Sequence, residues 1–169
     1  MDATVDNRED NTVDNPTDNP TDNVAIETDT CLFKNSRPML VMSSFIFITN
    51  SLTAYYFGYY LYSALFLFLT ITSVIVHTEN NYCTNIIDKF AVGFIVLYGG
   101  YMLSNKLTEN TDIFYFSAII ITFLVSAYLY VYGFITGQYC FCSEVDKQNM
   151  YHTIMHMISS FGHHLVIFL

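Results

Sequence analysis

The histidines near the end of the chain have the spacing that a helix needs to offer two imidazoles to one metal ion. His152 and His156 are four residues apart, so they lie one turn apart on one helix face. Ser73 and His77 repeat this spacing far upstream. If His77 faces the pair from a neighbouring helix, three imidazoles bind the ion and a fourth position stays open for water. The pattern predicts a catalytic Zn²⁺ site.

Asp88 and Ser73 are the further side chains that could act at such a site. The Asp88 carboxylate could accept a proton from water or orient a ligand, and the Ser73 hydroxyl could stabilise an oxyanion. Ionisable groups within a membrane span cost roughly 2.5–3.5 kcal/mol and usually mark a function. The alternative interpretation is that the histidines are interfacial polar residues bonded to neighbouring carbonyl groups.

The composition indicates that these residues belong to a membrane protein. Of 169 residues, 53% are hydrophobic and 12% are charged, so the lipid bilayer is the expected surrounding. Nearly all of the formal charge of −9 comes from residues 1–30, which hold nine acidic side chains and one arginine. No basic stripe is present, and nucleic acid is therefore not an expected partner.

Residues 1–36 are predicted to form a disordered acidic tail. From Asp2 to Ala25 the sequence falls into tetrads that mostly begin with Asp-Asn, and such residues cannot bury enough apolar surface to fold. The tail is interpreted as a solvated spacer, with an interaction segment as the alternative. Because the start lacks the regions of a cleavable signal, the first hydrophobic segment is expected to direct insertion.

Residues 37–169 are predicted to form an all-α, polytopic transmembrane helical bundle. The uncharged run 38–77 is too long for one crossing of a ~30 Å hydrocarbon core at roughly 1.5 Å per residue, so it predicts two helices with a break near 55–58. The further predicted spans are about 86–103, 113–136 and 150–169. The expected total is about five spans.

A hairpin within 113–141 would give six spans, and the polar residues distinguish the two counts. With an odd number of crossings, the end of the second helix and the starts of the third and last helices lie on the same side. His77, Asp88 and the pair His152 and His156 then share one membrane depth. Six spans would place the pair on the opposite side, so five are favoured.

Other motifs are weaker candidates. The four cysteines match no metal-binding spacing. His163 and His164 are expected to pack against a neighbouring helix or subunit, and Gly133 and Gly137 match the G-x-x-x-G packing motif. The sequence shows no phosphate-binding loop or nucleophile elbow, and no inverted repeat that would indicate a transporter.

As a set, the polar residues resemble the motif of the CREST superfamily of membrane hydrolases. That motif is Ser-x3-His, an Asp eleven residues after the histidine, and a final His-x3-His helix; this chain has Ser73-Val-Ile-Val-His77, Asp88 and His152-Thr-Ile-Met-His156. The stretch that begins at His77 resembles the GPI-anchor-remodelling lipases, and the ending of the chain resembles both those lipases and the alkaline ceramidases. The resemblance implies that the three histidines hold zinc, that Asp88 serves the attacking water and that Ser73 assists at the oxyanion.

The resemblance also implies an activity and a location. The expected substrate is a membrane lipid, cleaved at the amide of a ceramide or at an ester of a GPI-linked or other phospholipid, in the endoplasmic reticulum, the Golgi or another endomembrane. The family usually has seven spans, so this chain would be a shortened member, and Ile154-Met155 replaces the usual tryptophans. The alternative is a non-catalytic interaction or receptor-like membrane protein that retains the metal site.

The orientation of the bundle is left open. Lys34, Arg37, Lys89 and Lys147 outnumber Lys106, which places the site toward the cytoplasm by the positive-inside rule. The cysteines lie on the same side, however, and disulfides between them would require a lumenal side. The lipase resemblance also implies a lumenal site. No oligomeric state follows from the sequence.

Overall fold

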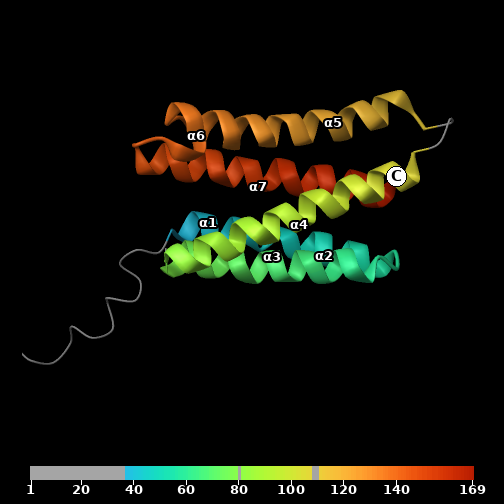
Figure 1. Cartoon of the computed structure of the whole chain (residues 1–169), viewed down its shortest axis with the longest axis horizontal. Coiled ribbons are helices and arrows are strands. Elements are labelled where there is room, and N and C mark those ends of the chain that lie inside the picture. The colour runs from blue at the N-terminus through green and yellow to red at the C-terminus, as the bar shows by residue number, and fades with distance from the viewer. Residues whose placement is uncertain (1–36, 80, 108–110) are drawn as a thin grey trace, which may run out of the picture. The chain divides into compact units, whose positions relative to one another are not determined.

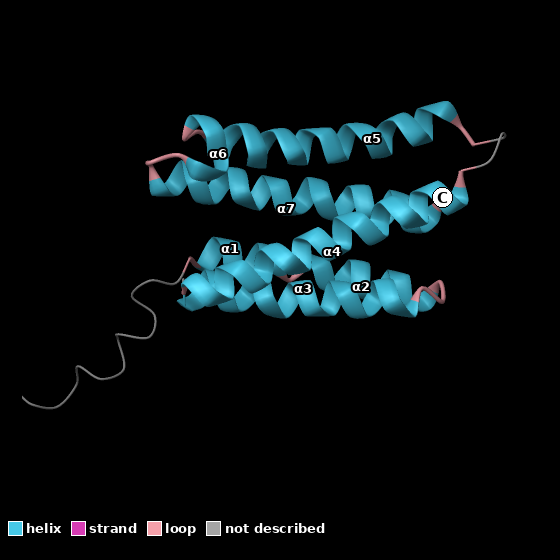
Figure 2. Cartoon of the chain, in the orientation of Figure 1, coloured by secondary structure: helices cyan, strands magenta, loops and turns pink. Residues whose placement is uncertain are grey.

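The structure is a computed structural model that describes residues 37–79, 81–107 and 111–169. The predicted acidic tail, residues 1–36, lies outside the described residues. Within the described ranges, every regular element is helical, as Figure 2 shows. The predicted all-α class is confirmed.

The first apolar segment is interrupted at Phe45. Helix α1 covers Pro38–Ser44 and α2 covers Ile46–Tyr56. The turn after α2 contains Gly58 with a φ of 83°, a left-handed conformation that glycine adopts at no steric cost. The predicted break near 55–58 is confirmed, but the interruption at Phe45 was not predicted.

Helices α3 and α4 follow, and both extend further than predicted. Helix α3 covers Tyr60–Glu79 and α4 covers Tyr82–Lys106. The side chain of Asn81 accepts a hydrogen bond of 3.2 Å from the Cys83 backbone N–H, which satisfies a donor that the first helical turn leaves free. This cap starts α4 early, so the third helix is longer than the predicted 86–103 and the loop before it is shorter.

The fourth helical segment is continuous. Helix α5 (Ile113–Ala127), the π-helical turn η1 (Tyr128–Tyr132) and α6 (Gly133–Thr136) follow one another without a turn. The predicted segment 113–136 is confirmed, and the hairpin that would have given six spans is absent from it. Gly137, with a φ of 66°, donates its N–H to the Gly133 carbonyl and ends the segment. The G-x-x-x-G motif thus forms a helix terminus.

The chain ends with the short helix η2 (Tyr139–Phe141) and the long helix α7 (Val145–Phe168). Helix α7 begins before the predicted position 150. It buries polar side chains and exposes apolar ones: His156 is 5% and Ser160 2% exposed, whereas Met157 is 54% and Phe161 58% exposed. A helix surrounded by lipid needs this distribution, because its polar groups find partners only inside the bundle.

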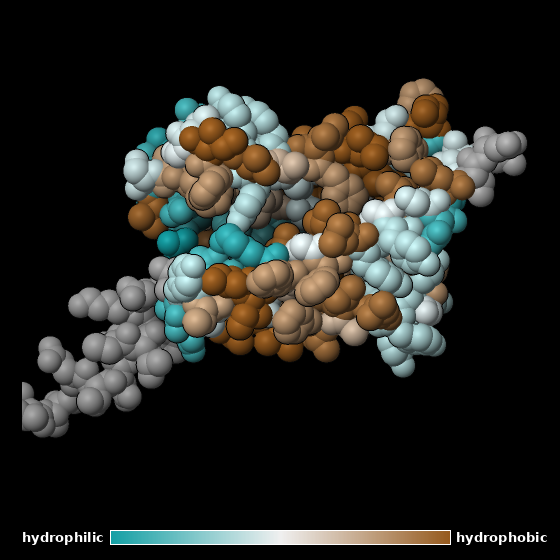
Figure 3. Space-filling model, viewed as in Figure 1, coloured by the Kyte–Doolittle hydropathy of each residue, from teal (hydrophilic) through white to brown (hydrophobic). Residues whose placement is uncertain are grey.

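Four helical segments of the described chain are long and apolar enough to cross a membrane. They are Pro38–Tyr56, Tyr60–Glu79, Tyr82–Lys106 and Ile113–Thr136. The inward-facing polar residues of α7 lower its hydropathy, so α7 is not among the four, and its crossing stays a prediction. The outer surface carries many large apolar side chains, brown in Figure 3, as a lipid-facing surface requires.

The helices form two groups, one of α1 to α4 and one of α5 to α7. The two groups meet along α7. Helix α3 packs between α2 and α4, and α7 packs against α1, α2 and α5 (Figure 1). Helix α4 contacts α7, whereas α4 and the α5–α6 segment make no backbone contact within the described part of the chain. The core between the groups contains Tyr62, Phe66, Leu69, Ile95, Ile119 and Val166.

Two polar clusters hold the second half of α7 in place. Asn50 Nδ2 donates to the Ser160 carbonyl at 2.9 Å and lies 2.7 Å from His164 Nδ1, while Ser160 Oγ donates to Asn50 Oδ1 at 2.5 Å. On the next face, the Tyr62 hydroxyl lies 2.5 Å from His163 Nδ1. The expected contacts of both histidines with neighbouring helices are confirmed.

Side chains from two other helices cap the last carbonyl groups of α7. Lys106 Nζ donates to the carbonyls of Val166 and Ile167 at 3.0 and 2.7 Å, and the Tyr115 hydroxyl donates to that of Leu165 at 3.1 Å. A cation here satisfies carbonyls without a helical partner and complements the helix dipole. These caps and the two polar clusters fix the rotation of α7, which carries two of the predicted metal ligands.

Neighbouring glycines in α4 test this packing. A Cβ at Gly99 would lie 2.8 Å from the Tyr62 hydroxyl oxygen and 3.1 Å from His163 Cε1, whereas one at Gly100 would meet nothing within 4 Å. Gly99→Ala is expected to lower the free energy of unfolding by about 1–3 kcal/mol. Gly100→Ala should raise it by up to about 1 kcal/mol, because alanine favours a helix. Unfolding measured in detergent micelles checks both, and equal effects would contradict the packing of Tyr62 against α4.

Candidate metal centre

Three histidines from two helices converge at one end of the bundle. His77 lies near the end of α3, and His152 and His156 lie in the first half of α7. One ring nitrogen of each lies within 4.8 Å of those of the other two. The ring centroid of His77 is 5.2 Å from that of His152 and 5.6 Å from that of His156. The predicted convergence of the three imidazoles is confirmed.

One ring nitrogen of the cluster is buried without a hydrogen-bond partner and could bind a metal ion. His77 is 7% exposed, and its buried Nε2 has no hydrogen-bond partner. A buried polar atom without a partner costs free energy, and such atoms in native structures usually bind a ligand, ion or water. Neutral imidazole nitrogens are ligands for zinc and related transition metals. The residues present therefore fit a metal ion.

A serine of α1 holds one of the three rings. Ser43 Oγ lies 2.9 Å from His156 Nδ1 and donates to the Leu40 carbonyl at 2.9 Å. The edge of the Phe47 ring contacts the same imidazole, with centroids 5.2 Å apart. Sequence reasoning missed Ser43. Its signal was the pair of adjacent serines in a stretch that otherwise carries apolar side chains.

Ser73 is deeply buried but bonds to α1. Its Oγ lies 3.0 Å from Ser44 Oγ, and Ser44 donates its own proton to the Leu40 carbonyl at 2.8 Å. Because Ser44 has only one hydroxyl proton, Ser73 is the donor in the bond between the two serines. Ser73 therefore joins α3 to α1, and its role at an oxyanion stays a prediction.

Asp88 lies beside α3, on the partly buried face of α4. Its Oδ1 accepts a 3.1 Å hydrogen bond from the Thr72 hydroxyl. Among the described residues, the group of ligand atoms within 4.8 Å of one another comprises the three histidines without Asp88. Asp88 therefore lies outside the group of histidine ligand atoms and is hydrogen-bonded to Thr72, the residue before Ser73. Sequence reasoning missed Thr72, whose threonine side chain in an apolar helix was the available signal.

Further polar groups lie close to His77 in space and to His152 along the chain. The Arg37 backbone N–H donates to the His77 carbonyl at 3.1 Å, which brings a cationic residue to this end of α3. Asn149 Oδ1 and Thr153 Oγ1, on the turns of α7 around His152, are buried without a hydrogen-bond partner. Figure 3 shows hydrophilic atoms in a hollow between the two helix groups on this face.

Among the described residues, the group of possible metal ligands at this centre contains no cysteine. Cys83, Cys140 and Cys142 are free, and Cys31 lies outside the described residues. Burial raises the pKa of the Cys140 thiol to about 11. A free thiol with this pKa stays protonated at neutral pH and is a poor nucleophile.

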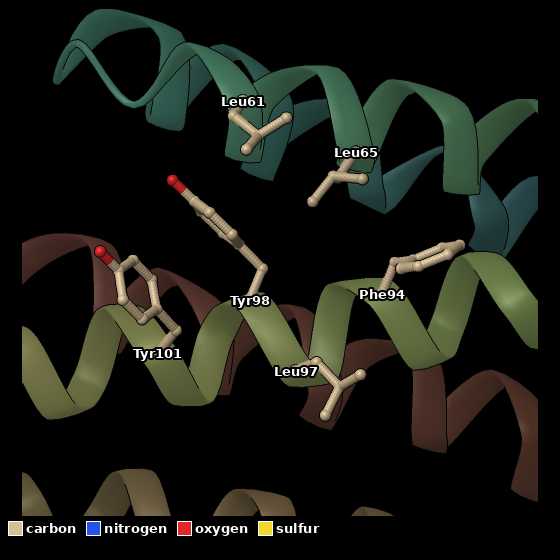
Figure 4. Close-up of a pocket in the computed structure, with 6 residues that line it drawn as sticks. All are labelled: Leu61, Leu65, Phe94, Leu97, Tyr98 and Tyr101. Atoms are coloured by element: carbon tan, nitrogen blue, oxygen red, sulfur yellow. The ribbon is translucent and has the colours of Figure 1, made fainter.

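A separate groove lies on the outer surface between α3 and α4. It has a volume of about 420 Å³, and Figure 4 shows its lining residues projecting from the two helices: Leu61, Leu65, Phe94, Leu97, Tyr98 and Tyr101. None of the three histidines lines it. Its aliphatic and aromatic walls suit contact with lipid.

Comparison of the chain with protein-family models, with curated proteins and with solved structures gave no match.

Proposed function

We propose that the chain is a multi-pass membrane hydrolase that uses zinc to cleave an amide or ester bond of a membrane lipid. The observation that carries the proposal is the buried cluster of His77, His152 and His156, with one unpartnered ring nitrogen, inside a bundle with an apolar outer surface. The resemblance of the motif to the CREST superfamily supports the same chemistry and an endomembrane location.

The donor set favours zinc over other ions. Three imidazoles with no thiolate and no bound carboxylate are a common catalytic zinc set, and they leave one coordination position open. When bound, zinc supplies Lewis-acid chemistry, which polarises a carbonyl group and lowers the pKa of water. His77, His152 and His156 would hold the ion.

Asp88 and Ser73 take the remaining roles in the proposal. The Asp88 carboxylate, which the Thr72 hydroxyl orients, accepts the proton of the attacking water and passes it to the leaving amine or alcohol. Ser73 stabilises the oxyanion by donating a hydrogen bond to it from its hydroxyl group. This requires Ser73 to release Ser44, 3.0 Å away, when substrate binds.

The arrangement of the helices supports a lipid substrate. Helix α4 makes no backbone contact with the α5–α6 segment in the described chain, so the bundle is open on the side where the hollow of Figure 3 lies. With α7 as a fifth crossing, its apolar outer face contacts lipid and its histidines face inward. An acyl chain could then reach the cluster sideways from the bilayer.

The second candidate is a non-catalytic membrane protein whose metal site stabilises the bundle. The bond of Ser73 to Ser44 favours it, because a hydroxyl used to join two helices is not free to act on a substrate. The two candidates differ in two observables. Removal of the metal would unfold the non-catalytic protein, and no lipid would be cleaved in its presence.

The test is turnover by the purified protein in lipid nanodiscs. We expect release of fatty acid from a ceramide or from a glycerophospholipid, loss of that release with a chelator, and its return with added zinc. The His152→Ala variant should be inactive under all three conditions. No release from either lipid class by protein that contains one zinc per chain would refute the enzymatic proposal.

A further inference from the structure

We infer that Ser43 is a positioning residue, which holds His156 in the tautomer that offers Nε2 to the metal ion. The inference rests on the proposed metal site and adds a residue that neither the motif nor the cluster of ligand atoms includes. It follows from the hydrogen bonds around the Ser43 hydroxyl.

The hydroxyl proton of Ser43 has a defined acceptor. A backbone carbonyl can only accept, so at the 2.9 Å contact with the Leu40 carbonyl Ser43 is the donor. Ser43 has no second proton for His156, whose Nδ1 lies 2.9 Å from the same oxygen. With the Ser43 proton directed to the Leu40 carbonyl, the His156 Nδ1 carries a proton and donates a hydrogen bond to Ser43. Its Nε2 is then left with a free lone pair, as a metal ligand needs.

The orientation of the ring is fixed from the same stretch of chain. Phe47, four residues after Ser43, places its ring edge-on to His156 with centroids 5.2 Å apart. Helix α1 is itself tied to α3, because Ser73 bonds to Ser44 and the Arg37 N–H donates to the His77 carbonyl. Ser43, which contacts His156 of α7, therefore belongs to a helix that is anchored next to His77 of α3.

This contact predicts a specific dependence of metal affinity on Ser43. A partner that fixes the tautomer and ring orientation of a ligand typically contributes 10–100-fold to metal affinity. Ser43→Ala keeps all three imidazoles but frees the His156 ring to exchange tautomers. Ser43→Thr keeps the hydroxyl. Ser51→Ala is the matched control, because Ser51 is a buried serine of α2 whose hydroxyl donates to the Ser63 carbonyl at 2.9 Å, away from the histidines.

The experiment combines ¹⁵N-histidine NMR of the metal-free protein with titration by Zn²⁺ and Co²⁺. We expect His156 to carry its proton on Nδ1 in the wild type and to populate both tautomers in Ser43→Ala. Zinc affinity should fall about 10–100-fold in Ser43→Ala, return in Ser43→Thr and stay unchanged in Ser51→Ala. A proton on Nε2 in the wild type, or an unchanged affinity in Ser43→Ala, would overturn the inference.

Two further outcomes separate this inference from its rivals. A wild-type protein that binds no metal refutes the proposed function, while the tautomer in the metal-free protein still tests Ser43 by itself. If Ser43 were instead a nucleophile activated by His156, a fluorophosphonate would label it and turnover would persist in chelator. Such labelling would overturn the positioning role, because it requires Ser43 to give its proton to the imidazole.

Discussion

Replacing His156 with alanine is expected to abolish zinc binding. The side chain is 5% exposed, and its ring contacts those of His77 and His152. The remaining two imidazoles cannot complete a three-histidine site, so the loss of affinity should exceed the 10–100-fold that removal of a positioning partner costs. Metal analysis of the purified variant should find almost no zinc, and lipid turnover should disappear with it.

The matched control is His164→Ala on the same helix. His164 is bonded to Asn50 rather than to the cluster, so its loss weakens the packing of α7 without removing a ligand. We expect His164→Ala to lower the thermal stability and to retain one zinc per chain. Equal zinc content in the His156→Ala and His164→Ala proteins would show that the cluster is not the metal site.

Replacing Asp88 with asparagine is expected to lower turnover by about 10²–10⁴-fold while the zinc content stays unchanged. In the wild type the Thr72 hydroxyl donates to Asp88 Oδ1 at 3.1 Å. The asparagine amide keeps this hydrogen bond, but it cannot accept a proton from water. Initial rates of fatty acid release from nanodiscs, with zinc measured on the same samples, check this prediction.

Asp146→Asn provides the comparison for Asp88. Asp146 lies exposed in the first turn of α7, outside the histidine cluster, so the same change of charge there should leave the rate unchanged. A wild-type rate in Asp88→Asn would remove Asp88 from the mechanism. Loss of zinc from Asp88→Asn would instead make the carboxylate a support of the metal site.

The convergence of the histidines was predictable because it depends on helix direction. The end of the second helix and the start of the last helix lie at the same end of the bundle when an odd number of helices connects through short loops. The i, i+4 spacing then puts His152 and His156 on one face. These two properties sufficed to bring His77 to the pair, as the ligand atoms within 4.8 Å of one another show.

The bonds around the cluster were not predictable from spacing. Ser43, Ser44 and Thr72 meet their partners across helix interfaces, and the rotation of each helix about its axis is set by packing that no local pattern contains. The exact helix boundaries were not predictable from spacing either. A capping side chain such as Asn81 extends a helix beyond its apolar residues, so α4 begins earlier than its hydropathy suggests.

The inward polar face of α7 explains why hydropathy describes this helix poorly. Its histidines and Ser160 lower the average, although Met157 and Phe161 give it an apolar outer surface. Polar residues in a membrane helix become acceptable when each finds a partner inside the bundle, as Ser160 does with Asn50. The residues that make α7 look less like a membrane span are those that carry the site and its support.

X-ray absorption at the zinc edge of the purified full-length protein is the most direct test of the metal centre. We expect one zinc per chain, bound by three imidazole nitrogens at about 2.0–2.1 Å with an oxygen ligand in the remaining position. A metal-free protein that is folded and cleaves lipid, or zinc bound through sulfur, would contradict it.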